Sequence, residues 1–290
     1  MAVKVITDST SYLPRALRAE FDIGVVGLSS LLDGVEYADD AEDYEPFYTA
    51  LAASGAMPTT SQPPVQEMFD AMEPHVAAGD AVVGVFISSR MSGTHSTALL
   101  ARDMVLEAHP DAVIEVVDGR SNSMELGYAA LAAARAAAAG QGVAEAVAAA
   151  EAMIERTRFL FVPATLEYLR RGGRIGNASA LVGALLQVRP ILTVVEGQTD
   201  IFAKVRTTRR ALDTIVETLA ADVRDKGGLG GAVVHHIHEP AGGAELAARV
   251  SEVVGVPVQS VPIGPAIGAH VGPGALAVVY HTVGPMRKSG

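Results

Sequence analysis

The chain has 290 residues, 49% of them hydrophobic, and a mean hydropathy of +0.29, so it can bury a core and is not an intrinsically disordered protein. Its net charge of −11 disfavours general binding to nucleic acid or to an anionic membrane. Cysteine is absent, which excludes disulfides, thiolate metal sites and cysteine nucleophiles.

The first half of the chain alternates short apolar runs with longer helical patterns. Strands separated by helices of this length predict a mainly parallel sheet with helical crossovers. Between the second strand and the first helix, Leu31–Tyr37 contains Asp33-Gly34, a hairpin turn signal. The predicted strands are Val3–Thr7, Ile23–Leu28, Ala81–Ile87 and Val113–Val117, and the predicted helices are Glu42–Ala53, Val65–Ala77, Thr94–Ala108 and Met124–Ala139.

A second series of elements begins near Arg158, after a connecting helix over Ala144–Thr157. It contains a predicted hairpin around the polar turn Glu196–Asp200. The predicted strands are Phe159–Val162, Ile191–Val195, Ile201–Arg206, Ala232–Ile237, Val258–Val261 and Ala275–Tyr280, and the predicted helices are Leu166–Arg171, Thr208–Arg224 and Gly243–Val254.

Each series is large enough to form a domain. We therefore expect an α/β fold with two domains, an N-terminal one over 1–157 and a C-terminal one over 158–284, followed by a tail over 285–290. We expect a ligand cleft between the two domains. The start of the chain lacks an apolar signal core, and the alanine-rich stretch Tyr128–Ala149 is too interrupted to span a bilayer, so we expect a cytoplasmic protein without stable membrane insertion.

Most standard catalytic signatures are missing. No P-loop pattern occurs, and the formal dinucleotide match at Gly272–Ala277 precedes a strand where the motif requires a helix. Ser92 lacks the glycine of a nucleophile elbow, because Arg90 stands two residues before it. The run His235-His236-Ile237-His238 would place two imidazoles on one side of a strand, either as metal ligands or as strand-end histidines; with no third ligand nearby, we expect no metal.

Two polar loops precede predicted helices. One places Thr60 and Ser61 before a helix that can begin at a proline, and the other places Ser92, Gly93 and Thr94 between a strand and a helix. Hydroxyls and free N–H groups at a helix start can bind an anion, although the same residues serve as ordinary N-caps. A third loop, Gly264–Gly274, surrounds His270 with glycine and proline, which predicts a rigid turn that orients the ring toward a site.

Basic residues gather in two short stretches of this acidic chain. Arg170, Arg171 and Arg174 surround a diglycine turn, and Lys204, Arg206, Arg209 and Arg210 follow the predicted hairpin. The stretches are either solvated helix ends, where arginine complements the helix dipole, or a docking patch for an anionic partner or a phosphate.

Five motifs in this order resemble the DegV family, which includes the fatty-acid-binding subunits of bacterial fatty acid kinase. The last two are the most specific, and together the five span nearly the whole chain. They are Thr7-Asp8-Ser9, Thr59-Thr60-Ser61-Gln62-Pro63, Ser88-Ser89-Arg90-Met91-Ser92-Gly93-Thr94, Leu166-Glu167-Tyr168-Leu169-Arg170-Arg171-Gly172-Gly173-Arg174-Ile175-Gly176 and Ile267-Gly268-Ala269-His270-Val271-Gly272-Pro273-Gly274. One segment departs from the family pattern, which commonly has Asp-Ser where this chain has Asp118-Gly119-Arg120-Ser121.

The resemblance implies a non-enzymatic protein, without a cofactor, that holds a long-chain fatty acid. It places the carboxylate near Thr60 and Ser92, with His270 close by, and implies a separate ATP-dependent kinase that converts the carboxylate to an acyl phosphate. We assign Ser61, Gly93 and Thr94 to the same ligand site, and Arg170, Arg174 and Arg206 to docking of the kinase or its phosphates.

Two other classes of function remain open from the residues alone. One is a hydrolase or acyltransferase that uses Ser92 or His270 on a lipid or another small carboxylate or ester, which the missing nucleophile elbow disfavours. The other is a nucleic-acid regulator that uses the arginine patch, which the net acidity disfavours. Retained lipid without turnover distinguishes fatty-acid binding from the first of these.

Overall fold

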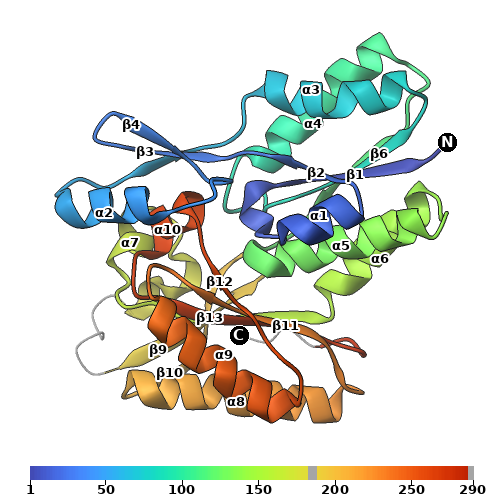
Figure 1. Cartoon of the computed structure of the whole chain (residues 1–290). Helices are drawn as coiled ribbons and strands as arrows, with labels where there is room; N and C mark the ends of the chain where they lie inside the picture. The colour runs from blue at the N-terminus through green and yellow to red at the C-terminus, as the bar shows by residue number, and fades with distance from the viewer. Residues whose placement is uncertain (182–187, 287–290) are drawn as a thin grey trace. The chain divides into compact units, whose positions relative to one another are not determined.

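The computed structural model describes residues 1–181 and 188–286 (Figure 1). The chain divides into two compact units, which we describe separately. Unit 1 comprises Met1–Ser29, Ala38–Asp40 and Thr60–Ile154, and unit 2 comprises Ser30–Tyr37, Ala41–Thr59 and Glu155–Gly290.

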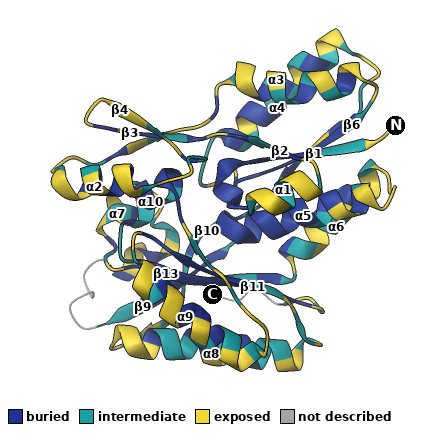
Figure 2. Cartoon of the chain, viewed as in Figure 1, coloured by how far each residue is buried: buried dark blue, intermediate teal, exposed yellow. Residues whose placement is uncertain are grey.

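Unit 1 contains a four-stranded parallel sheet in the order β2-β1-β6-β7. All six residues of the central strand β6 are buried, because helices lie on both faces of the sheet (Figures 1 and 2). The parallel sheet predicted from the alternating pattern is therefore confirmed. The strands are β1 (Val3–Asp8), β2 (Ile23–Val26), β6 (Ala81–Phe86) and β7 (Ile114–Asp118).

The helices of unit 1 form one layer on each side of this sheet. Helices α3 and α4 pack together on one side, and α5 packs against α6 and β1 on the other. Met68, Met72 and Phe86 are fully buried in the core below α3 and α4. The helices are α1 (Arg15–Glu20), α3 (Val65–Ala77), α4 (Thr94–Ala108), α5 (Ser123–Ala138) and α6 (Val143–Ile154), with a short 3-10 helix over Ser9–Ser11.

Unit 2 contains a mixed six-stranded sheet in the order β10-β9-β8-β13-β11-β12. Neighbouring strands are antiparallel except for the parallel pair β11–β12. The predicted hairpin is present and turns at Glu196-Gly197. The strands are β8 (Thr157–Val162), β9 (Arg189–Val195), β10 (Gln198–Val205), β11 (Leu229–His236), β12 (Ser260–Pro262) and β13 (Leu276–Thr282).

Two long helices cover the sheet of unit 2 and form its core with it. Helix α8 packs on β8, β9 and β13, and α9 packs on β11 (Figure 1). Tyr280, at the centre of β13, is fully buried in this core. The helices of unit 2 are α2 (Glu45–Ala53), α7 (Glu167–Arg171), α8 (Thr208–Asp225), α9 (Pro240–Val254) and α10 (Pro265–Val271), with a 3-10 helix over Gly176–Leu181.

The unit boundaries differ from the continuous domains expected over 1–157 and 158–284. The chain crosses into unit 2 at Ser30, where β3 (Ser29–Leu32) and β4 (Val35–Ala38) form the predicted hairpin, and again for α2. It crosses because the side chains of α2 bury themselves against α10 of unit 2: Tyr48 is 3% exposed and its hydroxyl donates to the Ile263 carbonyl at 2.7 Å.

Two local predictions require correction, and one helix was not predicted. Thr59–Ser61 forms strand β5, the third strand of a sheet ordered β4-β3-β5, where a polar loop was expected. The segment Gly264–Gly274 was expected to be a turn, but it is helical over α10 and turns only from Gly272. Helix α1 was missed because its six residues are too few to show a helical period.

The chain end from 285 was expected to be a tail. Met286 instead is 3% exposed in the core of unit 2, and its N–H donates to the Glu155 carbonyl at 2.8 Å. Residues 287–290 lie outside the described residues.

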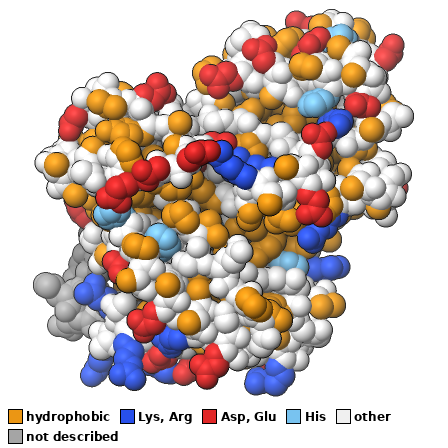
Figure 3. Space-filling model, viewed as in Figure 1, with side chains coloured by type: hydrophobic (Ala, Val, Ile, Leu, Met, Phe, Trp, Pro, Cys, Tyr) orange, Lys and Arg blue, Asp and Glu red, His pale blue; other side chains and the backbone are white. Residues whose placement is uncertain are grey.

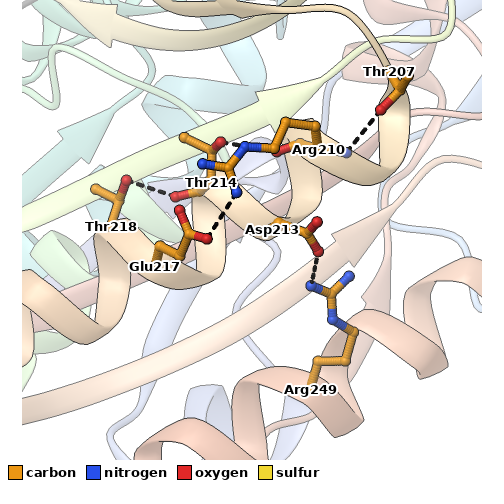
Figure 4. A network of polar contacts seen from close by, with 7 residues as sticks. All are labelled: Thr207, Arg210, Asp213, Thr214, Glu217, Thr218 and Arg249. Atoms are coloured by element: carbon orange, nitrogen blue, oxygen red, sulfur yellow. Dashed lines mark hydrogen bonds and ion pairs between the residues drawn. The ribbon is translucent and has the colours of Figure 1, made fainter.

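Ion pairs on α8 predict a contrast in stability between two acidic residues of one helix. Asp222 accepts the Tyr280 hydroxyl at 2.6 Å and lies 3.2 Å from Arg158, with 16% of its side chain exposed. Glu217 pairs with Arg210 at 2.8 Å but is 60% exposed (Figure 4). We expect Asp222→Ala to lower the free energy of unfolding by about 2 kcal/mol or more, because it removes the acceptor of the buried Tyr280 hydroxyl and the ion pair with Arg158.

The matched variant Glu217→Ala should change that free energy by less than about 0.5 kcal/mol, since water screens an exposed pair. Urea denaturation of both variants measures the difference. Equal effects would show that the buried network contributes no more than the exposed pair.

Candidate functional site

A buried carboxylate connects the carboxyl ends of β1 and β6 in unit 1. Asp8 is fully buried, and it accepts the Ile87 N–H at 2.7 Å and the Thr10 N–H at 3.0 Å. Burial raises the pKa of Asp8 to about 6, while these hydrogen bonds oppose the rise. Asp8 thereby holds Ile87, the residue that leads into the Ser88–Thr94 segment.

The loop before α4 presents a pair of hydroxyls. Ser92 Oγ lies 2.9 Å from Thr94 Oγ1 and also accepts the Thr94 N–H at 3.3 Å. Thr94 is fully buried, whereas Ser92 is half-buried. When Thr94 donates to Ser92, the Ser92 hydrogen remains available to an outside acceptor, because a hydroxyl has one donor and two acceptor positions.

Gln62 joins the Thr60 segment to the start of α4. Its amide nitrogen donates to Thr97 Oγ1 at 2.6 Å, and its side chain packs so closely on Gly93 that a Cβ there would lie 2.0 Å from Gln62 Oε1. A side chain at position 93 would therefore displace the Gln62 amide from this place. The structure therefore brings the two predicted polar segments together through Gln62. Gln62 is part of the motif Thr59-Thr60-Ser61-Gln62-Pro63, but the sequence analysis did not assign it to the ligand site.

The predicted hydroxyls of the first segment lie on a strand, not at a helix start. Thr60 is half-buried and Ser61 is exposed on β5. Helix α3 begins after Pro64 without a side-chain cap, so neither hydroxyl serves as its N-cap. The ordinary capping interpretation therefore fails for this segment.

The Asp118 segment, which departs from the family pattern, supports the Ser88–Thr94 loop. Asp118 accepts the Ser89 hydroxyl at 2.6 Å and the Arg120 N–H at 2.9 Å. Gly119 lies so close to Phe86 that a Cβ would stand 2.7 Å from the Phe86 carbonyl oxygen. This acidic residue at the end of β7 thus fixes the loop in which Ser92 lies.

In unit 2, His270 lies in the last turn of α10 and packs against the end of α7. A Cβ on Gly172 would stand 2.4 Å from His270 Nδ1, and one on Gly272 would stand 2.3 Å from the ring of Tyr168. Gly172 and Gly272, which belong to two separate motifs, therefore allow the rings of His270 and Tyr168 to lie close to the backbone. The ring of His270 is positioned by packing, not by a rigid turn alone.

Burial determines the protonation state of His270. Burial, together with the nearby Arg174 guanidinium, lowers the pKa of this imidazole to about 4. The ring is therefore neutral at pH 7. A neutral imidazole donates one hydrogen bond without adding a full charge.

The three arginines assigned to docking are all exposed on unit 2. Arg170 forms a two-pronged ion pair with Glu167, at 2.7 and 3.0 Å. This exposed pair on α7 fits the alternative of a solvated helix end. Arg174 donates to the Gly172 carbonyl at 2.6 Å, directly beside His270. Among the described residues, no acidic side chain pairs with Arg206.

The wider charge distribution is uneven along the chain. Residues 155–290 contain 15 of the 22 basic residues but only 11 of the 33 acidic ones. Figure 3 shows Lys and Arg side chains gathered over the α8 side of unit 2. The excess of basic residues therefore belongs to the segment that contains Arg170, Arg174 and Arg206.

The three histidines of the run at the end of β11 make separate local contacts. His235 is buried and its Nδ1 lies 3.1 Å from the Val261 carbonyl, while His236 Nδ1 accepts the Glu239 N–H. His238 stacks on Tyr48, with ring centroids 5.2 Å apart. In the described part of the chain, no group of three or more His, Asp or Glu side chains is arranged to hold a metal ion.

A small pocket lies in unit 2 between the end of β8 and the start of α8. Its volume is about 170 Å³, and Val162, Arg189 and Thr208 contribute to its lining. Arg189 donates to the Ala164 carbonyl at 3.2 Å at its edge. Drug-sized ligands occupy roughly 300–1,000 Å³, so we do not assign an acyl chain to this pocket.

His270 should contribute to the pH dependence of stability of the delipidated protein. Its pKa is lower in the folded chain than the ordinary 6.5, so its stabilising contribution is complete above pH 6.5 and is lost as the pH falls toward 4. We expect His270→Gln to reduce this loss by on the order of 3 kcal/mol, at about 1.4 kcal/mol per pH unit.

Chemical denaturation between pH 7 and pH 4 measures this effect. His235, whose pKa burial also lowers to about 4, and Asp8 contribute equally in parent and variant, so their effects cancel in the comparison. Parallel curves for the two proteins would contradict the buried, neutral state of His270.

Comparison with known proteins places this fold in a family. The family model described as "Uncharacterised protein, DegV family" matches residues 2–283. A DegV domain-containing protein of Clostridium acetobutylicum is 46% identical over 287 residues, which cover 99% of this chain and 100% of that protein.

Two solved structures share the fold over nearly the whole chain. One is described as fatty acid binding of a DegV family protein from Thermus thermophilus, with a TM-score of 0.88, 30% identity and coverage of 98% of this chain and 100% of that one. The other is described as a fatty acid (stearic acid)-binding protein from Eubacterium ventriosum, with a TM-score of 0.86, 26% identity and coverage of 96% and 98%.

Taken with the geometry, these comparisons define an α/β protein that contains a parallel sheet in unit 1 and a mixed sheet in unit 2. Its candidate polar residues lie on β5 and after β6 in unit 1, and in the last turn of the short helix α10 in unit 2. The chain belongs to the DegV family. No helix in the described residues is long and apolar enough to cross a membrane.

Proposed function

We propose that this protein binds one long-chain fatty acid and presents its carboxylate to a separate ATP-dependent kinase, which forms an acyl phosphate. The observation that carries the proposal is the likeness, at TM-scores of 0.88 and 0.86, to solved structures described as binding fatty acids. The kinase step rests on the family resemblance of the motifs and on the exposed arginines of unit 2.

The acyl chain supplies most of the binding free energy. Burial of a long chain contributes about 0.8 kcal/mol per methylene, on the order of 10 kcal/mol before the cost of association. A carboxylate left unpaired in such surroundings would cancel much of this gain, so its hydrogen bonds decide whether the ligand is held in one orientation.

The hydroxyls of Thr60 and Ser92 donate to this carboxylate in our proposal. Ser92 is suited to the role because its partner Thr94 is buried behind it, and because Gly93 and Gln62 fix the loop. Ser61, Gly93 and Thr94 complete the environment of these donors. Each hydrogen bond to the charged group contributes about 1.5–3 kcal/mol.

His270 completes the recognition of the carboxylate as a neutral donor. The lowered pKa of its ring supports this role, because a neutral imidazole orients the carboxylate without the strong ion pair that an imidazolium would form. The oxygen of the bound carboxylate therefore stays nucleophilic toward a phosphoryl donor.

Arg170, Arg174 and Arg206 dock the kinase or its phosphates. Their exposure, and the excess of basic residues in 155–290, support attraction of an anionic partner to unit 2. Such attraction weakens as salt rises, because the charges are accessible to water.

The kinase step is tested by incubating the oleate-loaded protein with ATP and a bacterial fatty acid kinase, then trapping acyl phosphate with hydroxylamine. We expect oleoyl hydroxamate only when protein, kinase and ATP are all present. Oleate that is never phosphorylated, or turnover of fatty acyl esters by this protein alone, would contradict the proposal.

A further inference from the structure

Helix α10 is held at its first residues by a tyrosine that lies far away in the sequence. The hydroxyl of Tyr48, on α2, donates to the carbonyl of Ile263 at 2.7 Å and lies 3.2 Å from that of Gly264. Gly264 is the N-cap of α10, and its carbonyl also accepts the Gly268 N–H at 2.9 Å. One phenol oxygen therefore anchors the backbone where the helix begins.

The same oxygen also fits closely against the middle of the helix. A Cβ on Gly268 would stand 2.2 Å from the Tyr48 hydroxyl, so only glycine allows the phenol to lie there. Gly268 precedes His270 by two residues. At the other end of the helix, the His270 ring packs on Gly172. Helix α10 is thus located between Tyr48 and the end of α7.

Tyr48 is itself fixed by its neighbours. Its ring stacks on His238 at an interplanar angle of 22° and meets Phe47 edge-on. His238 Nδ1 lies 3.4 Å from Glu45 on the same face of α2. The last member of the histidine run, His238, therefore helps to orient Tyr48. This role differs both from metal binding and from binding of the carboxylate.

We propose that Tyr48 is a positioning residue for His270: through its hydroxyl and its contact with Gly268, it sets the place of α10 and thereby the orientation of the imidazole toward the ligand. This inference rests on the proposed role of His270 in binding the carboxylate. Helix α2 lies in the first half of the sequence but belongs to unit 2 (Figure 1). The inference gives this helix a part in recognition of the carboxylate.

The test compares Tyr48→Phe with the parent in two measurements. The first is the pH titration of the His270 ring signal by NMR on protein labelled at histidine Cε1, with the signal assigned by its loss in His270→Ala. We expect its midpoint to rise by about one pH unit, because a loosened α10 exposes the ring to water. The second is oleate affinity by titration calorimetry, which we expect to fall about three- to tenfold.

Two further variants make the test specific. Tyr37→Phe removes the hydroxyl of a ring that packs on Phe47 in the same part of the chain, and it should match the parent in both measurements. Gly268→Ala pushes α10 from Tyr48 and should reproduce the changes of Tyr48→Phe. The double variant Tyr48→Phe, His270→Ala should bind oleate no more weakly than His270→Ala alone, because both changes remove the same interaction.

The outcomes separate this inference from the proposed function. A His270 titration that is unchanged in both Tyr48→Phe and Gly268→Ala overturns the positioning role, whatever the oleate affinity. Additive losses in the double variant overturn it as well. His270→Ala with the parent's oleate affinity overturns instead the proposed role of His270 in binding the carboxylate, and the ring titration still tests the link between Tyr48 and His270.

Discussion

Replacement of Ser92 by alanine should weaken oleate binding about tenfold or more, because the carboxylate loses one hydrogen bond from a hydroxyl, and each such bond to a charged group contributes about 1.5–3 kcal/mol. Acyl phosphate formation should fall further, since phosphoryl transfer depends on the orientation of the attacking oxygen as well as on occupancy. Calorimetric titration of delipidated protein and the hydroxamate assay measure the two effects.

Control variants for Ser92 and Thr60 remove a neighbouring hydroxyl of the same kind. Ser96→Ala alters an exposed hydroxyl on α4, and Thr59→Ala alters an exposed hydroxyl beside Thr60. Both should bind oleate like the parent, whereas Thr60→Ala should resemble Ser92→Ala. If Ser92→Ala, Thr60→Ala and His270→Ala all fold and match the parent in both assays, the carboxylate is held elsewhere.

The triple variant Arg170→Glu, Arg174→Glu, Arg206→Glu should lose most kinase-dependent phosphorylation, by tenfold or more, while it retains its fatty acid. Reversal of three exposed charges turns attraction of an anionic partner into repulsion, which affects association more than it affects a ligand held by neutral donors. Phosphorylation at several kinase concentrations, together with lipid content by mass spectrometry, checks the prediction.

The control for this variant changes the net charge equally at other places. The control variant Arg15→Glu, Arg102→Glu, Arg224→Glu replaces three arginines outside the proposed docking patch. Equal loss of phosphorylation in the two triple variants would assign the effect to overall charge. Loss of bound lipid from the first variant would show that the arginines serve the ligand site.

Much of the fold could be predicted because its strands are mainly apolar. β6 is apolar and buried throughout, β1 and β7 are mainly apolar, and the helices of unit 1 are long enough to show their period, so the parallel sheet followed from the pattern. α10 could not be recognised in the same way, because Gly268 within it and Gly272 directly after it serve close contacts with Tyr48 and Tyr168, which local propensity does not reveal.

The unit boundaries depend on tertiary contacts that a local reading of the chain does not contain. Residues 41–59 read as part of the first series, but α2 packs on unit 2 through Tyr48, 215 residues away from Ile263. The same separation concealed the role of the histidine run, since the partners of His238 are Glu45 and Tyr48.

The candidate site was predicted unevenly for the same reason. Ser92, Gly93 and Thr94 stand at a strand-to-helix connection, a position that pattern alone identifies as a ligand-binding place. Gln62 has no such signal, because its importance lies in the contact with Gly93 and Thr97. The pair Arg170–Glu167, by contrast, has the three-residue helical spacing from which an ion pair could have been expected.

The most direct test of the account is the identity of whatever the folded protein holds. The protein is purified from its bacterial expression host, denatured and extracted with solvent, and the released lipid is quantified by mass spectrometry. We predict about one long-chain fatty acid per chain. Protein that is consistently empty, and that binds neither oleate nor stearate when these are added, would contradict fatty-acid binding.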